Sequence, residues 1–281
     1  MTLSYVLALA AAIAAASALH EGPLVRGLVG DVAATCVVFA FSLAFDNSSF
    51  YDPYWSVAPP VLGAYWWWHA GARTDARTIL VLALVTLWAV RLTYNWAVGW
   101  RGLGHEDWRY VDIRARTGRA YWPASFAGIH MFPTVQVFLG CLALYAALTS
   151  RAPLSLLDGV GALVTFAAIV IEAVADTQLR AFASSPTRVP GAIMERGLWA
   201  FSRHPNYFGE ALFWWGLVAF AAAAAQPFHW WYAAGALAIS AMFAGVSIPL
   251  MEKRSLARRP EYAFLQRRVS MIVPWFRRRG T

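Results

Sequence analysis

Ionisable residues stand at the end of an apolar stretch where a membrane-crossing helix is expected. Glu172, Asp176 and Arg180 follow one another at intervals of four residues, so they share one face of a helix. Ionisable groups at such a depth are costly and usually face a bundle interior or a water-filled cavity. The pattern fits either a structural ladder of ion pairs at a helix end or the wall of a site for a charged ligand.

A second polar group lies in the segment SRHPNYFGE, just before another apolar stretch. Pro205 suits the first turn of a helix, where no backbone donor is lost. Asn206 and Glu210 then share a face, with Arg203 and His204 at the rim. Glu210 would enter the hydrocarbon, so it needs a partner or a ligand. No second His or Cys lies nearby, so we expect no metal site.

Two further polar residues lie near earlier apolar runs. Arg91 is in the middle of such a run, where it either snorkels to an interface or lines a cavity wall with Trp88 and Tyr94. Asp52 lies between tyrosines in SSFYDPYW, beside a run boundary. As a bare pattern, this segment fits an interfacial aromatic belt with a turn.

Apolar helices must position these residues. The chain has 281 residues, of which 59% are hydrophobic and 14% charged, whereas soluble domains carry about a quarter charged residues. Runs of about 18 or more apolar residues indicate membrane spans. The sequence therefore predicts an all-α membrane bundle of seven helices, with an eighth short candidate at 57–70. The seven runs are 3–19, 27–45, 79–94, 126–148, 156–175, 207–225 and 230–250.

The distribution of basic residues predicts the orientation. Five lie in Arg101–Arg119, four in Arg180–Arg203 and nine from Lys253 onward. This positive-inside pattern places these regions and the C-terminus in the cytoplasm, so the net charge of +8 reports topology and not nucleic-acid binding. No linker or repeat is visible, and we expect one membrane-embedded domain over residues 1–281.

Four segments resemble the steroid 5α-reductase family, especially its bacterial members. They are GLWAFSRHPNYFGEALFWWG (197–216), SFYDPYW (49–55), GHEDWRY (104–110) and DTQLRAF (176–182). The similarity covers most of the chain from about residue 45 to 276. RHPNY is shared with isoprenylcysteine methyltransferases and related sterol reductases, and the EDWRY and FYDPYW elements favour the reductases.

The resemblance implies NADPH-dependent reduction of the C=C bond of an enone, such as a 3-oxo-Δ4 steroid. Hydride would reach the β-carbon while a hydrogen-bond donor stabilises the charge on the carbonyl oxygen. It implies substrate-side spans over about 1–125 and NADPH-binding spans and loops over about 126–281. The cofactor-binding residues would be Arg109, Asp176, Arg180, Arg203, His204, Asn206, Tyr207 and Glu210.

The carbonyl site departs from the family, which places a Glu on an early span and a Tyr on the next. Asp52 is the nearest carboxyl here, with Tyr54 and Tyr94 as candidate phenols, and these three are the expected catalytic residues. We expect Asp52 to have a raised pKa because of its aromatic setting. Trp55, Trp88 and Arg91 are the expected substrate-binding residues.

Two other function classes remain open. One is methyl transfer from S-adenosylmethionine to a lipid-like acceptor, and the other is a non-enzymatic lipid transporter, which often shows internal repeats. The nearly Lys-free, Ala- and Arg-rich composition suggests a GC-rich bacterial genome. We therefore expect a monomer in the bacterial inner membrane, with a lipophilic substrate and a cofactor site that faces the cytoplasm.

Overall fold

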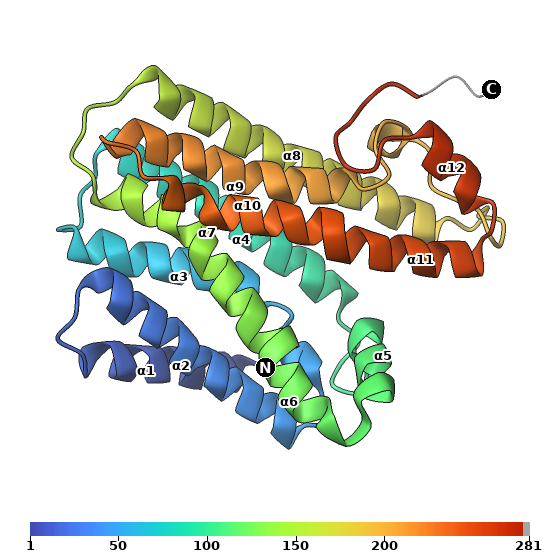
Figure 1. Ribbon diagram of the computed structural model, residues 1–281, viewed down its shortest axis with the longest axis horizontal. Coiled ribbons are helices and arrows are strands. Elements are labelled where there is room, and N and C mark those ends of the chain that lie inside the picture. Colours follow the sequence, from blue (N-terminus) through green and yellow to red (C-terminus); the bar gives the residue numbers. More distant parts are fainter. Residues whose placement is uncertain (278–281) are drawn as a thin grey trace.

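The computed structural model describes residues 1–277, which fold mainly into helices (Figure 1). Within this range there is no strand, only one isolated bridge between Ser202 and Ser270. The expected all-α fold is confirmed. The α-helices are α1 (Thr2–Ser17), α2 (Pro23–Ala44), α3 (Tyr54–His69), α4 (Ala76–Gly99), α5 (Trp108–Thr117), α6 (Tyr121–Ser125), α7 (Phe132–Thr149), α8 (Leu156–Ser184), α9 (Pro205–Ala224), α10 (Ala234–Met242), α11 (Ile248–Arg258) and α12 (Tyr262–Arg268).

Helices occur at all eight predicted apolar runs. Across residues 1–277, six helical stretches are long and apolar enough to cross a membrane. The helices α1 and α3 have 16 residues each, and α3 contains Pro59 and Pro60. The predicted seven or eight runs therefore correspond to six long stretches and two shorter helices. The long stretches are Pro23–Ala44, Ala76–Gly99, Trp108–Thr149, Leu156–Ser184, Pro205–Ala224 and Trp230–Arg258.

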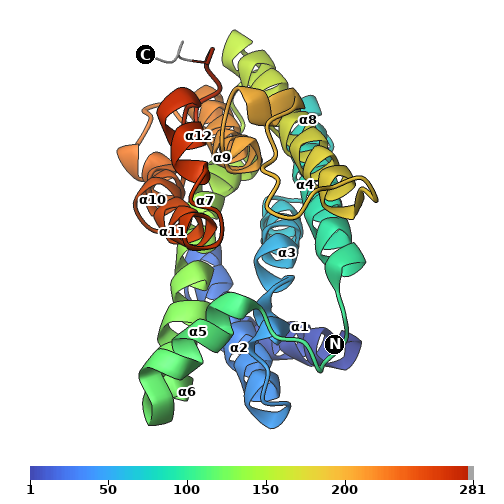
Figure 2. The same ribbon diagram turned by 90° about the vertical axis from the view of Figure 1, so that its right-hand side faces the viewer.

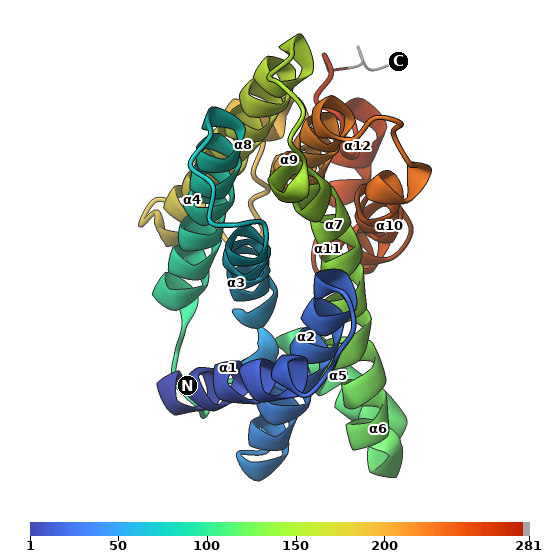
Figure 3. The same ribbon diagram turned by 90° about the vertical axis from the view of Figure 1, so that its left-hand side faces the viewer.

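The connections rich in arginine gather at one end of the bundle, called the polar end below. Figure 2 looks onto this end, where α5 and α12 lie in front of the longer helices. The Asn47 side-chain amide donates to the backbone carbonyls of Leu103 and His105, and Arg259 donates to the carbonyl of Ala192. Figure 3 looks onto the opposite end, where short connections join α1 to α2 and α3 to α4. The three regions at the polar end hold 18 of the 23 basic residues, as the positive-inside pattern predicts, and the connections at the opposite end hold few.

Helices α8 and α9 approach each other closely along their length. A Cβ atom on Gly209 would lie 2.9 Å from the carbonyl oxygen of Ala168, and one on Gly216 would lie 2.2 Å from the Thr165 hydroxyl. Only glycine fits at these two contacts. Small residues of this kind let helix backbones approach in membranes, and here they bring the polar faces of α8 and α9 together.

Two proline residues follow widened helical turns. The π-helical segments Phe126–Met131 and Phe243–Ser247 lead into α7 and α11, where Pro133 and Pro249 occupy the first turns. A proline ring clashes with the carbonyl four residues earlier in a regular α-helix. The widened turns relieve that clash and keep each pair of helices continuous.

Candidate functional site

Polar side chains of α4, α8 and α9 meet near the polar end, and we call them the α4–α8–α9 network. Asp176 is at its centre. Its carboxylate pairs with Arg91 and accepts hydrogen bonds from the side-chain amides of Asn95 (3.2 Å) and Asn206 (3.1 Å). The exposed Arg180 donates to the Asn95 carbonyl oxygen. The structure thus brings together four predicted site residues, and Asn95 links them.

Glu210 forms the buried inner end of this region. One carboxylate oxygen accepts a hydrogen bond from the Trp88 indole at 2.9 Å, and the other accepts from the Trp214 indole at 2.8 Å. Trp88 also stacks on Phe213, with ring centroids 4.4 Å apart and planes 9° apart. The expected partner of Glu210 is therefore a pair of indoles, set in an aromatic wall that excludes water.

Three polar atoms of the α4–α8–α9 network are buried without a hydrogen-bond partner among residues 1–277. They are Glu172 Oε2, Asn206 Oδ1 and Arg91 Nη1, three of the six such atoms found. Arg91 Nη1 lies 2.7 Å from Glu172 Oε1, but the pair is not aligned as a hydrogen bond. Asn206 must turn its amide nitrogen toward Asp176, because a carboxylate only accepts, so its oxygen faces away. Buried polar atoms in proteins normally have a hydrogen-bond partner. Two of these atoms can each accept a further hydrogen bond, and Arg91 Nη1 can donate one.

Helices α4 and α8 run parallel and in a fixed register. Arg77 bonds to Asp158, Arg91 pairs with Glu172, and Asn95 bonds to Asp176. The two members of each pair are 81 positions apart. The first and second contacts are separated by about 21 Å of helix, so the Arg77–Asp158 pair at the opposite end helps to set the register of the network.

Arg203 and His204 belong to a separate cluster. The Arg203 guanidinium donates to both carboxylate oxygens of Glu252, at 2.6 and 3.2 Å, and to the carbonyls of Gln266 and Val269. His204 Nε2 lies 3.1 Å from the same carboxylate. These contacts fasten the start of α9 to α11 and α12, and they occupy the donors of Arg203 that were predicted to face a cofactor.

Arg109 and Tyr207 lie near the network but outside it. Arg109 makes two hydrogen bonds to Asp107, at 2.8 and 3.0 Å, and its side chain is 45% exposed. The Tyr207 hydroxyl lies 3.1 Å from the sulfur of Met251, and its ring packs edge-on against Phe243. Arg109 is therefore accessible at the polar end, as a phosphate-binding residue must be.

Asp52 has a phenol partner other than the two predicted. The Tyr110 hydroxyl donates to Asp52 Oδ1 at 2.7 Å. Burial raises the pKa of Asp52 to about 6, while the hydrogen bond from Tyr110 and the charge of Arg109 lower it. The expected rise in pKa is borne out, and its main cause is desolvation.

The other two predicted catalytic residues lie elsewhere. The Tyr54 hydroxyl donates a hydrogen bond of 2.6 Å to Oδ1 of Asp31, a residue of α2. Tyr94 is 62% exposed on α4. Trp55 is half-buried and packs between two hydrophobic clusters, whereas Trp88 and Arg91 lie in the region of the network. Within residues 1–277, therefore, neither Tyr54 nor Tyr94 donates a hydrogen bond to Asp52, although Tyr54 is only two residues away along the chain.

Comparison with known proteins places the chain in a family. A family model described as "Protein of unknown function (DUF1295)" matches residues 38–269. The chain belongs to this DUF1295 family. An uncharacterized protein of Schizosaccharomyces pombe (strain 972 / ATCC 24843), C594.04c, is 26% identical over 278 residues, which cover 91% of this chain and 80% of the yeast protein. No solved structure matches the chain.

The region matched by the DUF1295 model contains every predicted site residue. It also contains residues that contact the predicted ones but were not predicted from the sequence. Asn95 lies one helical turn after Arg91, a spacing that would have identified it. Tyr110 lies inside the EDWRY segment but is paired only through folding. Glu252 follows the last apolar run without any local sign that it binds Arg203.

Proposed function

We propose that this DUF1295 protein is a membrane-embedded, NADPH-dependent reductase of the C=C bond of a lipophilic enone. The observation that carries the proposal is the α4–α8–α9 network, which combines buried ion pairs with three polar atoms that have no hydrogen-bond partner among residues 1–277. The four segments that resemble steroid 5α-reductases support it, as does the association of this family with steroid 5α-reductase-like proteins. A 3-oxo-Δ4 steroid is the model substrate.

The three buried atoms that lack a hydrogen-bond partner within residues 1–277 suit the amide end of a nicotinamide cofactor. A carboxamide offers two N–H donors and one carbonyl acceptor. Glu172 Oε2 and Asn206 Oδ1 are acceptors, and Arg91 Nη1 is a donor. Asp176 would hold Asn206 and Arg91 in place, since it bonds to both.

Arginines at the polar end suit the phosphates. Arg180 is exposed where the network reaches the surface, and Arg109 is accessible on α5. Guanidinium groups bind phosphate oxygens with two parallel hydrogen bonds. Tyr207 and Glu210, on the same helix as Asn206, would complete the wall of the cofactor site.

When bound, the cofactor supplies the hydride. The protein's own contribution is to exclude water and to stabilise charge on the carbonyl oxygen. The buried rings of Trp88, Phe213 and Trp214 provide the dry wall. The Asp52–Tyr110 pair, in which Asp52 has a pKa raised to about 6, is our proposed proton-sharing group at the polar end. Tyr54 and Tyr94 are not part of this pair, because the Tyr54 hydroxyl donates to Asp31 and Tyr94 is exposed.

The basic connections support an orientation with the cofactor site facing the cytoplasm of a bacterial cell, in the inner membrane. The substrate would then enter from the bilayer, and the cofactor from the aqueous side. We propose that one chain suffices, because the residues of the network all come from α4, α8 and α9.

A titration and a turnover assay test the proposal. Purified protein in lipid nanodiscs should bind NADPH about tenfold or more tightly than NADH, because arginine can grip the 2′-phosphate. It should consume NADPH with one of a panel of enones that includes a 3-oxo-Δ4 steroid. Arg180→Ala should weaken NADPH binding, whereas Arg188→Ala, which removes an exposed arginine beyond the same helix, should not.

Three outcomes would contradict the proposal. They are equal affinity for NADPH and NADH, no NADPH consumption across the panel, and binding of S-adenosylmethionine in place of NADPH. The last result would favour methyl transfer.

A further inference from the structure

A cavity of about 180 Å³ lies between α1, α2 and α3. Helices α1 and α2 lie on the side of the molecule away from α8 and α9 (Figures 1 and 2). Its walls are mostly apolar. On α3 it extends from Tyr54 to Tyr65, which is about 16 Å of helix. An apolar cavity of ~150 Å³ is enough to hold benzene. This volume, spread over 16 Å, makes a narrow groove that suits one extended chain.

A carboxyl group lines this groove at mid-helix. Asp31 is the ninth of the 22 residues of α2 and is only 5% exposed. One oxygen accepts the Tyr54 hydroxyl, and the other, Oδ2, has no hydrogen-bond partner in the described chain. The Tyr65 hydroxyl, which also lines the groove, has none within residues 1–277 either. An ionisable group inside a membrane span is expensive and marks a functional site.

The charges around the groove select a neutral ligand. Arg26 lines the same cavity and is in no ion pair among the described residues. It disfavours a cation, and Asp31 disfavours an anion. A hydroxyl group can donate to an ionised carboxylate and accept from a protonated one. It therefore satisfies Asp31 in either state.

The ligand can enter from the bilayer. Leu9, Ile13 and Val61 line the cavity and are 45%, 59% and 40% exposed. Because they lie on apolar helices, their exposed faces meet lipid. An extended lipid could pass between α1 and α3 along this rim.

We propose that the groove between α1, α2 and α3 binds an extended, neutral lipid alcohol whose hydroxyl bonds to Asp31 beside Tyr54. This site shares no residue with the α4–α8–α9 network and does not depend on the proposed reductase function. Helix α1 and the first part of α2 also lie outside the region matched by the family model. The alcohol is either a membrane lipid or a product or relative of the enzyme's substrate.

Photolabelling without NADPH tests the site. The probe is hexadecan-1-ol carrying a diazirine on its chain, and the matched probe is the same diazirine alkane without the hydroxyl. The alcohol should label peptides of α1–α3, unlabelled hexadecan-1-ol should compete, and the alkane should label about tenfold less. Asp31→Leu should reduce labelling by the alcohol about tenfold, while Asp31→Asn, which keeps a donor and an acceptor, should retain a substantial part.

Two variants that keep Asp31 test whether a loss of labelling comes from the groove and not from misfolding. Ala12→Phe fills the groove and should abolish labelling. Leu163→Phe replaces a residue of α8 that is 70% exposed, and it should not change labelling. Equal labelling by the two probes, or unchanged labelling in both Asp31→Leu and Ala12→Phe, would overturn the proposal.

Two measurements distinguish the sources of the alcohol. A lipid alcohol extracted from wild type and missing from Asp31→Leu would identify a membrane lipid. Competitive inhibition of NADPH consumption by hexadecan-1-ol would identify a substrate relative. Because labelling is measured without NADPH, its result tests the lipid-alcohol site independently of reductase activity.

Discussion

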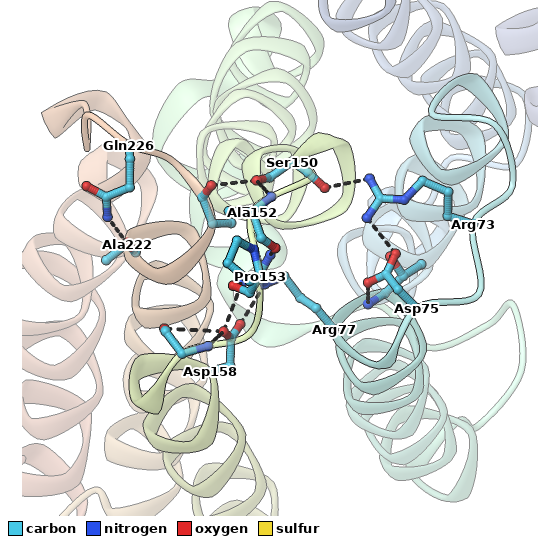
Figure 4. A network of polar contacts seen from close by, with 12 residues as sticks. Arg73, Asp75, Arg77, Ser150, Ala152, Pro153, Asp158, Ala222 and Gln226 are labelled. Atoms are coloured by element: carbon cyan, nitrogen blue, oxygen red, sulfur yellow. Dashed lines mark hydrogen bonds and ion pairs between the residues drawn. The ribbon is translucent and has the colours of Figure 1, made fainter.

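Two arginines at the end of the bundle opposite the polar end provide a matched test of burial. Arg77 and Arg73 both pair with an aspartate (Figure 4). Arg77 and its partner Asp158 have side chains 2% and 5% exposed, and Arg73 and Asp75 have 23% and 38%. The two pairs differ mainly in their access to water.

The contacts of Arg77 set the size of the expected effect. Its guanidinium donates to both oxygens of Asp158, at 2.6 and 2.8 Å, and to the carbonyls of Ala152 and Pro153, at 2.7 and 2.9 Å. Arg77→Met keeps most of the apolar stem but leaves a buried carboxylate without its cation. Breaking a buried pair in this way costs about 3–5 kcal/mol. Arg73→Met breaks an exposed pair and should cost about 0–1 kcal/mol.

The assay is thermal unfolding in detergent, followed by size-exclusion chromatography of the surviving protein. A loss of 1 kcal/mol lowers the midpoint by about 2–4 °C in a domain of comparable size. Arg77→Met should therefore lower it by roughly 10 °C, and Arg73→Met by a few degrees at most. The double variant Arg77→Met with Asp158→Leu should recover most of the loss, because no charge is left buried.

The same substitution tests the register argument. If the Arg77–Asp158 pair sets the register of α4 on α8, Arg77→Met should also weaken NADPH binding, although it lies about 21 Å from Arg91. Equal midpoints for the two single variants, or a double variant no more stable than Arg77→Met, would refute the reasoning.

Three further predictions concern the polar end. Asn206→Ala or Glu210→Ala should weaken NADPH binding about tenfold or more in a titration, while the protein remains folded. Well-folded variants with wild-type affinity would remove both residues from the site. The pKa of Asp52 is raised from 3.8 to about 6, so the stability contributed by its proton is complete below about pH 4 and is lost as pH rises to about 6. Across that range the free energy of unfolding of wild type should fall by up to ~3 kcal/mol relative to Asp52→Asn, which unfolding midpoints would measure. A difference between the two proteins that does not change with pH would contradict this. Glu252→Gln leaves Arg203 buried without its carboxylate, so trypsin should cut α12 faster than in wild type, and unchanged cleavage would show that the cluster does not hold α12 in place.

The sequence predicted the helices and the main polar face well because both follow from local periodicity. Glu172, Asp176 and Arg180 share a face by their spacing alone, and the structure places Arg91 against the first two. Asn206 and Glu210 also share a face. Long apolar runs in a membrane protein leave helix as the main option, because each backbone polar group must be paired within its own segment.

Pairings between distant segments could not be predicted in the same way. Arg203 lies three residues from Asn206, but it turns toward Glu252 on α11. Asp52 pairs with Tyr110, 58 residues further along the chain, in place of the nearby tyrosines. Both choices depend on how helices pack around connections at the polar end, and local spacing contains no information on that packing.

Three clusters of charge in this chain show what separates a structural ion pair from a site. In the Arg77–Asp158 and Arg203–Glu252 pairs, both carboxylate oxygens accept from arginine, and neither pair leaves a buried atom unpaired within residues 1–277. The α4–α8–α9 network also joins an arginine to buried carboxylates, yet each of its three helices has a buried atom without a hydrogen-bond partner among residues 1–277. In a ladder that served only to join helices, every buried polar atom would have a hydrogen-bond partner, as in the other two clusters. Buried atoms without a partner lower the stability of the fold and do not help to join the helices. The incomplete pairing therefore favours a ligand in this network, and it is the physical reason to prefer a binding site over a structural ladder.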